Sequence, residues 1–225
     1  MDITIVVPVR LGSTRCINKN LRPFAGTSLF DLKLDQLKPL KDKVVVSSSA
    51  SEVLQHAKDR GFQVHLRDPW YSRSETTGAE FYECLSSAIN TEWMLYTTAM
   101  CPFVSANMYI DSINLLSNQL DTYNCLASST LVKQFLYDRG PINFSQGHAP
   151  RSQDLPDIRY TNFAINIART SFVKEKRALV DDKPLWYDLN QLESIDIDTE
   201  FDFQCAELLY KHYSEASESS ESLDS

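Results

Sequence analysis

Residues 3–20 join a strand-like apolar run to a segment that is rich in basic and hydrogen-bonding side chains. The segment contains Arg10, Gly12, Ser13, Arg15, Lys19 and Asn20. In open parallel sheets, ligands bind beyond the carboxyl ends of the strands, where glycine allows close backbone approach and cations meet phosphate. This composition favours a loop that binds the phosphates of a nucleotide. An ordinary connection with solvated basic residues would have the same composition, and the loop matches neither the Walker pattern nor a dinucleotide fingerprint.

Two carboxylates, Asp196 and Asp198, lie one residue apart at the end of an apolar segment. If the segment is a strand, both side chains face one side of the sheet and Ile195 and Ile197 face the other. Carboxylates together with substrate phosphates are the usual ligands of Mg²⁺, so the spacing predicts a magnesium site. In the alternative interpretation, Asp198 or Thr199 caps the last helix and Asp196 is simply exposed.

A third polar segment, residues 150–166, contains Arg151 and Gln153 ahead of a predicted strand. A planar guanidinium pairs with a carboxylate at two points, so Arg151 and Gln153 could recognise the carboxylate and hydroxyls of a polar substrate. A surface loop held by salt bridges would look similar, although exposed ion pairs contribute only about 0–1 kcal/mol. Arg67 follows the third predicted strand, where it would contact either a base or ribose or only solvent.

These segments are separated by apolar runs that alternate between strand and helix periodicity. Strands are expected at residues 43–49, 62–66 and 93–99, and helices at 29–40, from Ser51, from Thr77 and after Ser105. This alternation is typical of a largely parallel sheet with helices on both faces. Beyond residue 123, short strands joined by irregular loops indicate a β-richer insertion. A late strand at 193–197 and a final helix at 198–213 complete the predicted α/β fold.

The composition limits the classes of partner. A chain of 225 residues that is 43% hydrophobic is long enough for one α/β domain. Half of the net charge of −8 comes from four acidic residues in 214–225, which we expect to be a disordered tail. An acidic body argues against a nucleic-acid partner, and no apolar stretch approaches the roughly 20 residues that span a membrane. The five cysteines form no C-x-x-C pair, which favours reduced thiols in a cytoplasmic protein.

Four motifs occur in an order that resembles the acylneuraminate cytidylyltransferase family, whose members make CMP-sialic acids and related CMP-activated acidic sugars. They are V-P-x-R-x-G-S-x-x-x-x-x-K-N at 7–20, H-L-R at 65–67, P-R-S-Q-D-L-P at 150–156 and S-I-D-I-D-T-E at 194–200. The resemblance implies a Rossmann-like nucleotidyltransferase fold with a mostly parallel sheet. It also implies one cytidylyltransferase domain over residues 1–213, with a small β-rich dimerisation insertion at about 130–190 that reaches the partner of a homodimer.

The resemblance further implies a reaction and a role for each matching residue. The reaction is transfer of CMP from CTP to the anomeric hydroxyl of a sialic-acid-like 2-keto sugar acid, with release of pyrophosphate. The implied nucleotide-binding residues are Arg10, Gly12, Ser13, Arg15, Lys19, Asn20 and Arg67, of which Arg67 contacts cytidine. The implied sugar-binding residues are Lys133, Arg151 and Gln153, and Asp196 and Asp198 bind Mg²⁺. Arg10, Lys19 and Asp198 are the implied catalytic residues.

The sequence departs from the family pattern at three places. Thr14 follows the loop serine where the family commonly has lysine, and Thr98–Cys101 stands in place of a Gln-Pro-Thr-Ser segment. Phe163 follows Asn162 where the family has glycine. The last two changes fall where the sugar is expected, so they predict an altered acceptor site. A CMP-KDO synthetase, a noncatalytic nucleotide- or sugar-binding relative and a glycosyltransferase that uses D-x-D are the alternative interpretations.

Overall fold

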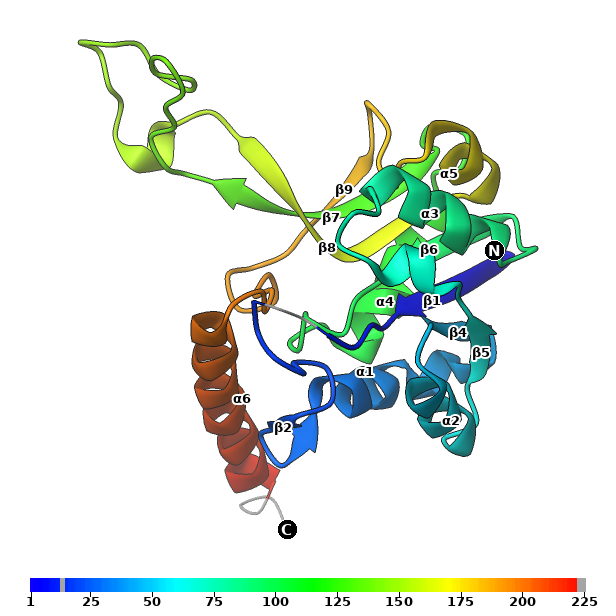
Figure 1. Cartoon of the computed structure of the whole chain (residues 1–225). Helices are drawn as coiled ribbons and strands as arrows, with labels where there is room; N and C mark the ends of the chain where they lie inside the picture. The colour runs from blue at the N-terminus through cyan, green and yellow to red at the C-terminus, as the bar shows by residue number, and fades with distance from the viewer. Residues whose placement is uncertain (13–14, 222–225) are drawn as a thin grey trace.

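A seven-stranded sheet forms the centre of the molecule in the computed structural model, which describes residues 1–12 and 15–221 and side chains as far as residue 214 (Figure 1). Its order is β5-β4-β1-β6-β8-β7-β9. The strands are β1 Ile3–Pro8, β4 Val44–Ser48, β5 Gln63–Leu66, β6 Trp93–Tyr96, β7 Cys125–Val132, β8 Ile158–Arg169 and β9 Leu185–Asp188. Of these strands only β8 runs antiparallel to its neighbours, which confirms the predicted, mostly parallel α/β sheet.

Helices cover both faces of this sheet, as the alternating sequence pattern predicts. The α-helices are α1 Leu29–Leu37, α2 Ser51–Asp59, α3 Gly78–Ser87, α4 Ala106–Ser117, α5 Thr170–Lys176 and α6 Glu200–Glu221. Short 3₁₀ segments are η1 Lys38–Lys43, η2 Pro69–Ser72 and η3 Ser152–Asp154, and a small hairpin joins β2 Pro23–Phe24 to β3 Thr27–Ser28. One apolar core lies between the sheet and α1, α2 and α4, and a second lies under α3 and α5.

The helix starts follow the local hydrogen-bonding chemistry. Thr77 begins α3 with a capping box, in which its hydroxyl accepts from the Glu80 backbone N–H and the Glu80 carboxylate accepts in return. The hydroxyl of Ser105 likewise accepts from the first turn of α4. The helix predicted from Ser51 does begin at that residue, but Ser51 lies within α2 and no described side chain caps the helix start. Ala50 precedes α2, and its backbone N–H donates to the Ser48 hydroxyl at 3.1 Å. A serine at the end of β4 therefore accepts a hydrogen bond from the residue before the helix.

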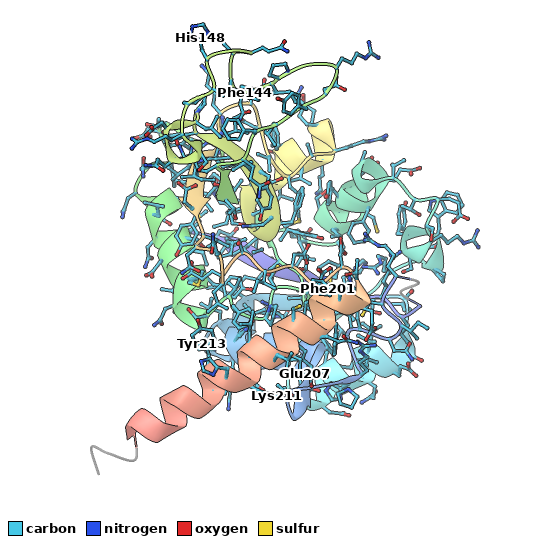
Figure 2. All side chains as sticks on the ribbon, turned by 90° about the vertical axis from the view of Figure 1, so that its left-hand side faces the viewer. Phe144, His148, Phe201, Glu207, Lys211 and Tyr213 are labelled. Carbon is cyan, nitrogen blue, oxygen red and sulfur yellow. The ribbon has the colours of Figure 1, made fainter. Side chains whose placement is uncertain are left out.

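Strands β7 and β8 continue beyond the sheet as a long two-stranded arm (Figure 1). The arm, residues 130–160, carries an aromatic cluster in which Phe144 lies 5.0 Å from Phe135 and 5.2 Å from Tyr137 between ring centroids. Figure 2 shows Phe144 and His148 at its far end. The insertion expected at about 130–190 contains this arm. However, the inner part of β8, helix α5 and strand β9 fall in the same range and belong to the main sheet and its cover.

The strand predicted at 193–197 is absent from the described structure, where these residues form a turn and an extended segment. The strand at this edge of the sheet is β9, which pairs with β7, and residues 193–197 do not pair with it. Ile197 is instead buried in a third apolar cluster with Phe24 on the hairpin and Phe203 on α6. Its backbone N–H donates to the Met100 carbonyl at 3.0 Å, which fixes the segment beside the end of β6.

Helix α6 lies at one side of the molecule, with Phe201, Glu207, Lys211 and Tyr213 along it in Figure 2. Its backbone is helical as far as Glu221, so it extends into the segment from residue 214 that the sequence predicts to be a disordered tail. No glycine or proline interrupts the acidic segment, and the helix simply continues into it. Residues 222–225 lie outside the described part. Within that part, no helix has both the length and the apolar composition that a membrane span requires.

Candidate functional site

A cavity of about 250 Å³ opens where β1, β5 and β6 reach their carboxyl ends. Its basic lining residues are Arg10, Arg15, Lys19, Arg67 and Arg73. Asp198 is the acidic residue among its described lining, so cations outnumber carboxylates five to one. The remaining walls are formed mainly by Asn20, Tyr96, Thr98 and the first turn of α3. A small cavity with this charge imbalance is suited to a compact polyanion.

The buried side chain of Asn20 stabilises the loop after β1. Its Nδ2 donates to the Arg10 carbonyl at 3.0 Å, which bends the loop back toward the strand. Gly12 has a φ of 79°, a left-handed conformation that glycine adopts without strain, and no atom of the described residues beyond its chain neighbours lies within 4 Å of the position of a Cβ there. Arg10 is exposed at the cavity and its guanidinium contacts the Ser72 carbonyl at 3.5 Å. Ser13 falls outside the described residues.

Two cations of the first loop, Lys19 and Arg15, contact the segment that contains Asp198. Lys19 is buried, and its Nζ donates to the Ile197 carbonyl at 2.7 Å and lies 3.4 Å from Asp198 Oδ1. Arg15 Nη2 reaches the same carboxylate oxygen at 2.9 Å. Residues about 180 positions apart in the chain are thereby joined at one point. The structure therefore brings together Arg10, Arg15, Lys19 and Asp198 as the sequence motifs predict.

Asp196 and Asp198 face different spaces. Asp198 lines the basic cavity, whereas Asp196 lines a second cavity of about 420 Å³ between β8 and the start of α6. Asp196 keeps solvent contact. Nevertheless, desolvation by the surrounding protein raises its pKa to about 6, with a smaller contribution from the neighbouring Asp198 charge. Among the described residues, no three His, Cys, Asp or Glu side chains are grouped as a metal site by themselves.

Arg67 is an almost fully buried cation, with only 1% of its surface exposed. Its guanidinium donates to the Ser47 and Val9 carbonyls at 3.2 and 3.3 Å and lies 5.0 Å from the centroid of the Phe81 ring. Within the described chain no carboxylate pairs with it, and its buried Nε has no partner. Burial lowers the pKa of Arg67. An uncompensated buried cation at a cavity wall is a position where an anionic or carbonyl group of a ligand would be stabilised.

The sequence motifs missed one wall of the basic cavity. Arg73, Thr76, Thr77, Gly78 and Phe81 line it from η2 and the start of α3. The sequence does contain a signal for this wall. The capping-box spacing from Thr77 to Glu80 follows Arg67 closely, and it indicates a helix that begins at the carboxyl edge of the sheet.

The second cavity contains acidic but no basic side chains among its described lining residues. These are Tyr160, Thr161, Asn162, Phe163, Gln191, Ser194, Ile195, Asp196, Asp202, Cys205 and Ala206. Of the positions where the sequence departs from the family pattern, Phe163 lines this cavity and Thr98 lines the basic one. Cys101 is fully buried, which raises its pKa to about 12, and it lines neither cavity. Its thiol therefore contributes to the core.

The three predicted sugar-binding residues all lie on the arm, away from both cavities of their own chain. Lys133 donates to the Leu155 carbonyl at 2.7 Å and pairs with Asp157. Arg151 pairs with Asp154 at 2.8 Å, and Gln153 is exposed. Within one chain, these side chains are not brought to Asp196 and Asp198. Figure 1 shows why, since the arm projects outward from the sheet.

The strand order, the basic cavity and the cations at the carboxyl edge place the molecule among nucleotidyltransferases of the α/β type. A CMP:2-keto-3-deoxy-manno-octonic acid synthetase complexed with CTP has this fold, with a TM-score of 0.68 and 10% identity over 95% of this chain and 100% of that one. A 4-diphosphocytidyl-2C-methyl-D-erythritol synthase from Anaerococcus prevotii gives 0.67 and 13% over 93% and 98%. A cytidylyltransferase from Leptospira borgpetersenii gives 0.58 and 18% over 90% and 84%.

The sequence itself supplies the family. The family model described as cytidylyltransferase matches residues 4–180, which include the first loop, Arg67 and the arm. The chain belongs to the cytidylyltransferase family. No curated protein matches the sequence. The matched range ends before Asp196 and Asp198, so the assignment of the carboxylate pair depends on the geometry described above.

Proposed function

We propose that the protein transfers CMP from CTP to the anomeric hydroxyl of a sialic-acid-like 2-keto sugar acid and releases pyrophosphate. One observation carries this proposal: the Asp196–Asp198 segment separates a cation-rich cavity from a second cavity of acceptor size. CTP in the first cavity would present its α-phosphate at this boundary. An acceptor in the second would approach the same boundary from the other side. The arrangement suits transfer between two bound substrates.

In this reaction the protein acts by positioning and by charge. The acceptor hydroxyl oxygen forms a bond to the α-phosphorus as the bond to the bridging oxygen breaks, and the hydroxyl proton is lost to water. Pyrophosphate carries away the developing negative charge. Arg10, Arg15 and Lys19 line the cavity in which we propose that the triphosphate binds, so they would stabilise this charge without forming a covalent intermediate. Arg67, buried beside Phe81, would hold the nucleoside.

Mg²⁺ is the cofactor that we assign to this site, and Asp196 and Asp198 are the residues that would hold it. The donor chemistry fits, because two carboxylates and substrate phosphate oxygens are ligands of the type that Mg²⁺ requires. The pKa of Asp196 is raised mainly by burial and next by the neighbouring Asp198 charge, and a bound cation would relieve the second effect. When bound, the ion would neutralise phosphate charge and polarise the α-phosphoryl group.

An acidic acceptor requires a cation that its cavity does not provide. Asp196 and Asp202 are the charged residues among the described lining, and both are acidic. Arg151 and Lys133 on the arm supply the missing charge if the arm belongs to a second copy of the chain. The arm also exposes apolar side chains, including Tyr137 at 66% and Ile142 at 58%, that such contact would cover. We therefore propose a homodimer in which each arm completes the acceptor site of its partner.

Pyrophosphate release tests the proposed reaction. The purified protein is mixed with Mg²⁺, each of the four NTPs in turn, and N-acetylneuraminic, legionaminic, pseudaminic or KDO acid. We expect release with CTP and one acid, with loss of release when EDTA removes the metal ion. Release with KDO alone would assign the alternative substrate. Binding of CTP without release across the panel would support a noncatalytic relative and contradict the proposal.

A matched pair of variants tests the carboxylates. Asp198→Asn should lower kcat by at least two orders of magnitude while the circular dichroism spectrum stays unchanged, because the substitution removes charge and keeps shape. Asp121→Asn, an exposed carboxylate that lines neither cavity, is the control and should keep wild-type turnover. Near-normal activity of Asp198→Asn would contradict the assignment of Asp198 as a ligand of Mg²⁺. It would not affect the family membership, which rests on residues 4–180.

A further inference from the structure

Phe163 adopts a backbone conformation that a bulky side chain rarely takes. Its φ is 55°, in the left-handed region that glycine occupies without strain. A non-glycine residue persists there only when the surrounding structure enforces the conformation, and such residues gather at functional sites. The position of Phe163 therefore calls for two explanations: what holds the backbone, and what the ring does.

The backbone is held by a buried polar network at a bulge in β8. The register between β7 and β8 shifts after Ala127, so that residues 162–165 oppose Ser128 alone. Ser128 Oγ donates to Asn162 Oδ1 at 2.5 Å and accepts from the Ile165 backbone N–H at 2.9 Å. Asn162 Oδ1 also accepts from the Ala164 backbone N–H at 3.3 Å. Because Ser128 and Asn162 are buried, this network fixes the bulge and turns residue 163 outward.

The ring is not required by the core. Phe163 is 37% exposed and belongs to none of the three apolar clusters. Among the described residues it has no aromatic or cation–π partner. It does line the second cavity together with Asp196. The fold thus maintains, at a strained backbone position, an aromatic residue that lines the second cavity.

The rest of that cavity combines polar side chains with small or aliphatic ones such as Ile195 and Ala206. Gln191, Ser194 and Asp202 provide donors and acceptors, whereas Phe163, with Tyr160 beside it in the lining, provides apolar ring surface. Sites for small polar ligands commonly combine an apolar or aromatic wall with a few polar groups that fix orientation. A pyranose has matching surfaces, because its C–H groups form an apolar face and its hydroxyls project from the rim.

We infer that Phe163 determines acceptor specificity, its ring forming the wall against which the C–H face of a pyranose acceptor packs. This inference rests on the proposed function, since it names the residue that selects the acceptor of that reaction. It predicts that a cyclic acid is used in preference to an acyclic polyol phosphate, because an acyclic chain has no such face.

Two substitutions separate the ring from the strain. Phe163→Ala removes the ring and keeps a side chain at positive φ, whereas Phe163→Gly removes both the ring and the strain. Pyrophosphate release is measured with varied acceptor at saturating CTP, and then with varied CTP. The acceptors are the four sugar acids and 2-C-methyl-D-erythritol 4-phosphate. Phe201→Ala is the matched control, since Phe201 is 73% exposed on α6 and lines neither cavity.

We expect both Phe163 variants to raise the KM for the acceptor at least ten-fold and to leave the KM for CTP within two-fold. The Tm of Phe163→Gly should exceed that of Phe163→Ala, which confirms that strain was relieved in a folded protein. An unchanged acceptor KM in Phe163→Gly would overturn the inference and leave the proposed function standing. A wild-type protein that releases no pyrophosphate with any acceptor would overturn both. Use of the acyclic acceptor alone would also overturn the inference.

Discussion

Lys33 is an ammonium group enclosed in the core, and its titration should be measurable in the stability of the protein. Helix α1 places it at 0% exposure, where its Nζ donates to Tyr109 Oη at 2.6 Å and to the Cys101 carbonyl at 3.2 Å. Within the described chain it forms no ion pair with a carboxylate. Burial consequently lowers the pKa of Lys33 from 10.5 to about 8.

The direction of the effect follows from proton binding. Lys33 binds its proton more weakly in the folded chain than in the unfolded chain, so the free energy of unfolding rises with pH between the two pKa values. Each pKa unit corresponds to about 1.36 kcal/mol. From about pH 7 to 9.5, Lys33 should add about 2 kcal/mol to the free energy of unfolding. In the folded chain Cys101 and Tyr109 stay protonated in this window, because burial raises the pKa of Cys101 to about 12 and also raises that of Tyr109. The Cys101 thiol of the unfolded chain does titrate here, so the contribution of Lys33 is read as a difference from a variant that keeps Cys101.

Urea unfolding of the wild type and of Lys33→Met across this pH range isolates the contribution. Methionine fills a similar volume without a charge, and the other titrating groups are common to both proteins, so their contributions cancel in the difference. The wild type should gain about 2 kcal/mol relative to the variant between about pH 7 and 9.5. Parallel curves would refute the reasoning, because they would mean that Lys33 has the same pKa in the folded and unfolded chains.

Lys33→Met should also lower turnover, although Lys33 lines neither cavity. Its Nζ holds the Cys101 carbonyl, and the preceding carbonyl, that of Met100, accepts from the Ile197 backbone N–H at 3.0 Å. Loss of the ammonium group would loosen the support of the segment that carries Asp196 and Asp198. We expect a reduced kcat with little change in the KM for CTP, which identifies Lys33 as a positioning residue.

Three further outcomes follow from the sites described above. Arg67→Lys should weaken CTP binding at least ten-fold in calorimetry, because lysine cannot reproduce the forked contacts and the stacking on Phe81; unchanged affinity would contradict this role. Chains with Arg151→Ala and chains with Asp198→Asn should each be inactive by themselves. When equal amounts are mixed and exchange subunits, about half of the dimers are mixed and each of these has one intact site, so about a quarter of wild-type activity should return. No recovery would argue against sites completed in trans. Thr77→Ala should cost about 1 kcal/mol in urea unfolding by removing the cap of α3, and an equal stability would mean that the cap is replaced.

The sequence predicts the parts of the site whose chemistry is concentrated in short segments. The loop from Arg10 to Asn20 and the pair at 196 and 198 could be identified because several functional groups lie within a few residues of one another. Their meeting across the fold, through Lys19 and Asp198, does not follow from a shared sheet edge, because the segment before Asp198 is not a strand. The α/β order was predictable, since each strand and helix has a clear local period.

The remaining features depend on contacts between distant segments. Residues 193–197 have strand-like alternation, but Ile197 is buried against Phe24 and Phe203 and bonds to the Met100 carbonyl instead of joining the sheet. Nothing in the local pattern indicates these distant contacts. The arm illustrates a second limit, because Arg151 has the expected type and motif yet lies outside both cavities of its own chain. A single sequence does not specify which copy of a chain a side chain will serve.

The sharing of Asp198 between Arg15 and Lys19 has a thermodynamic consequence. Without a ligand, this carboxylate and these cations neutralise one another, so neither is free for its own partner. A phosphate group that attracts Arg15 would release Asp198 toward a divalent ion, and an ion that engages Asp198 would release Arg15 toward phosphate. Linkage requires the two effects to be equal, so nucleotide and metal ion would each raise the affinity of the other by the same factor. The resting ion pairs would therefore weaken the binding of either ligand alone.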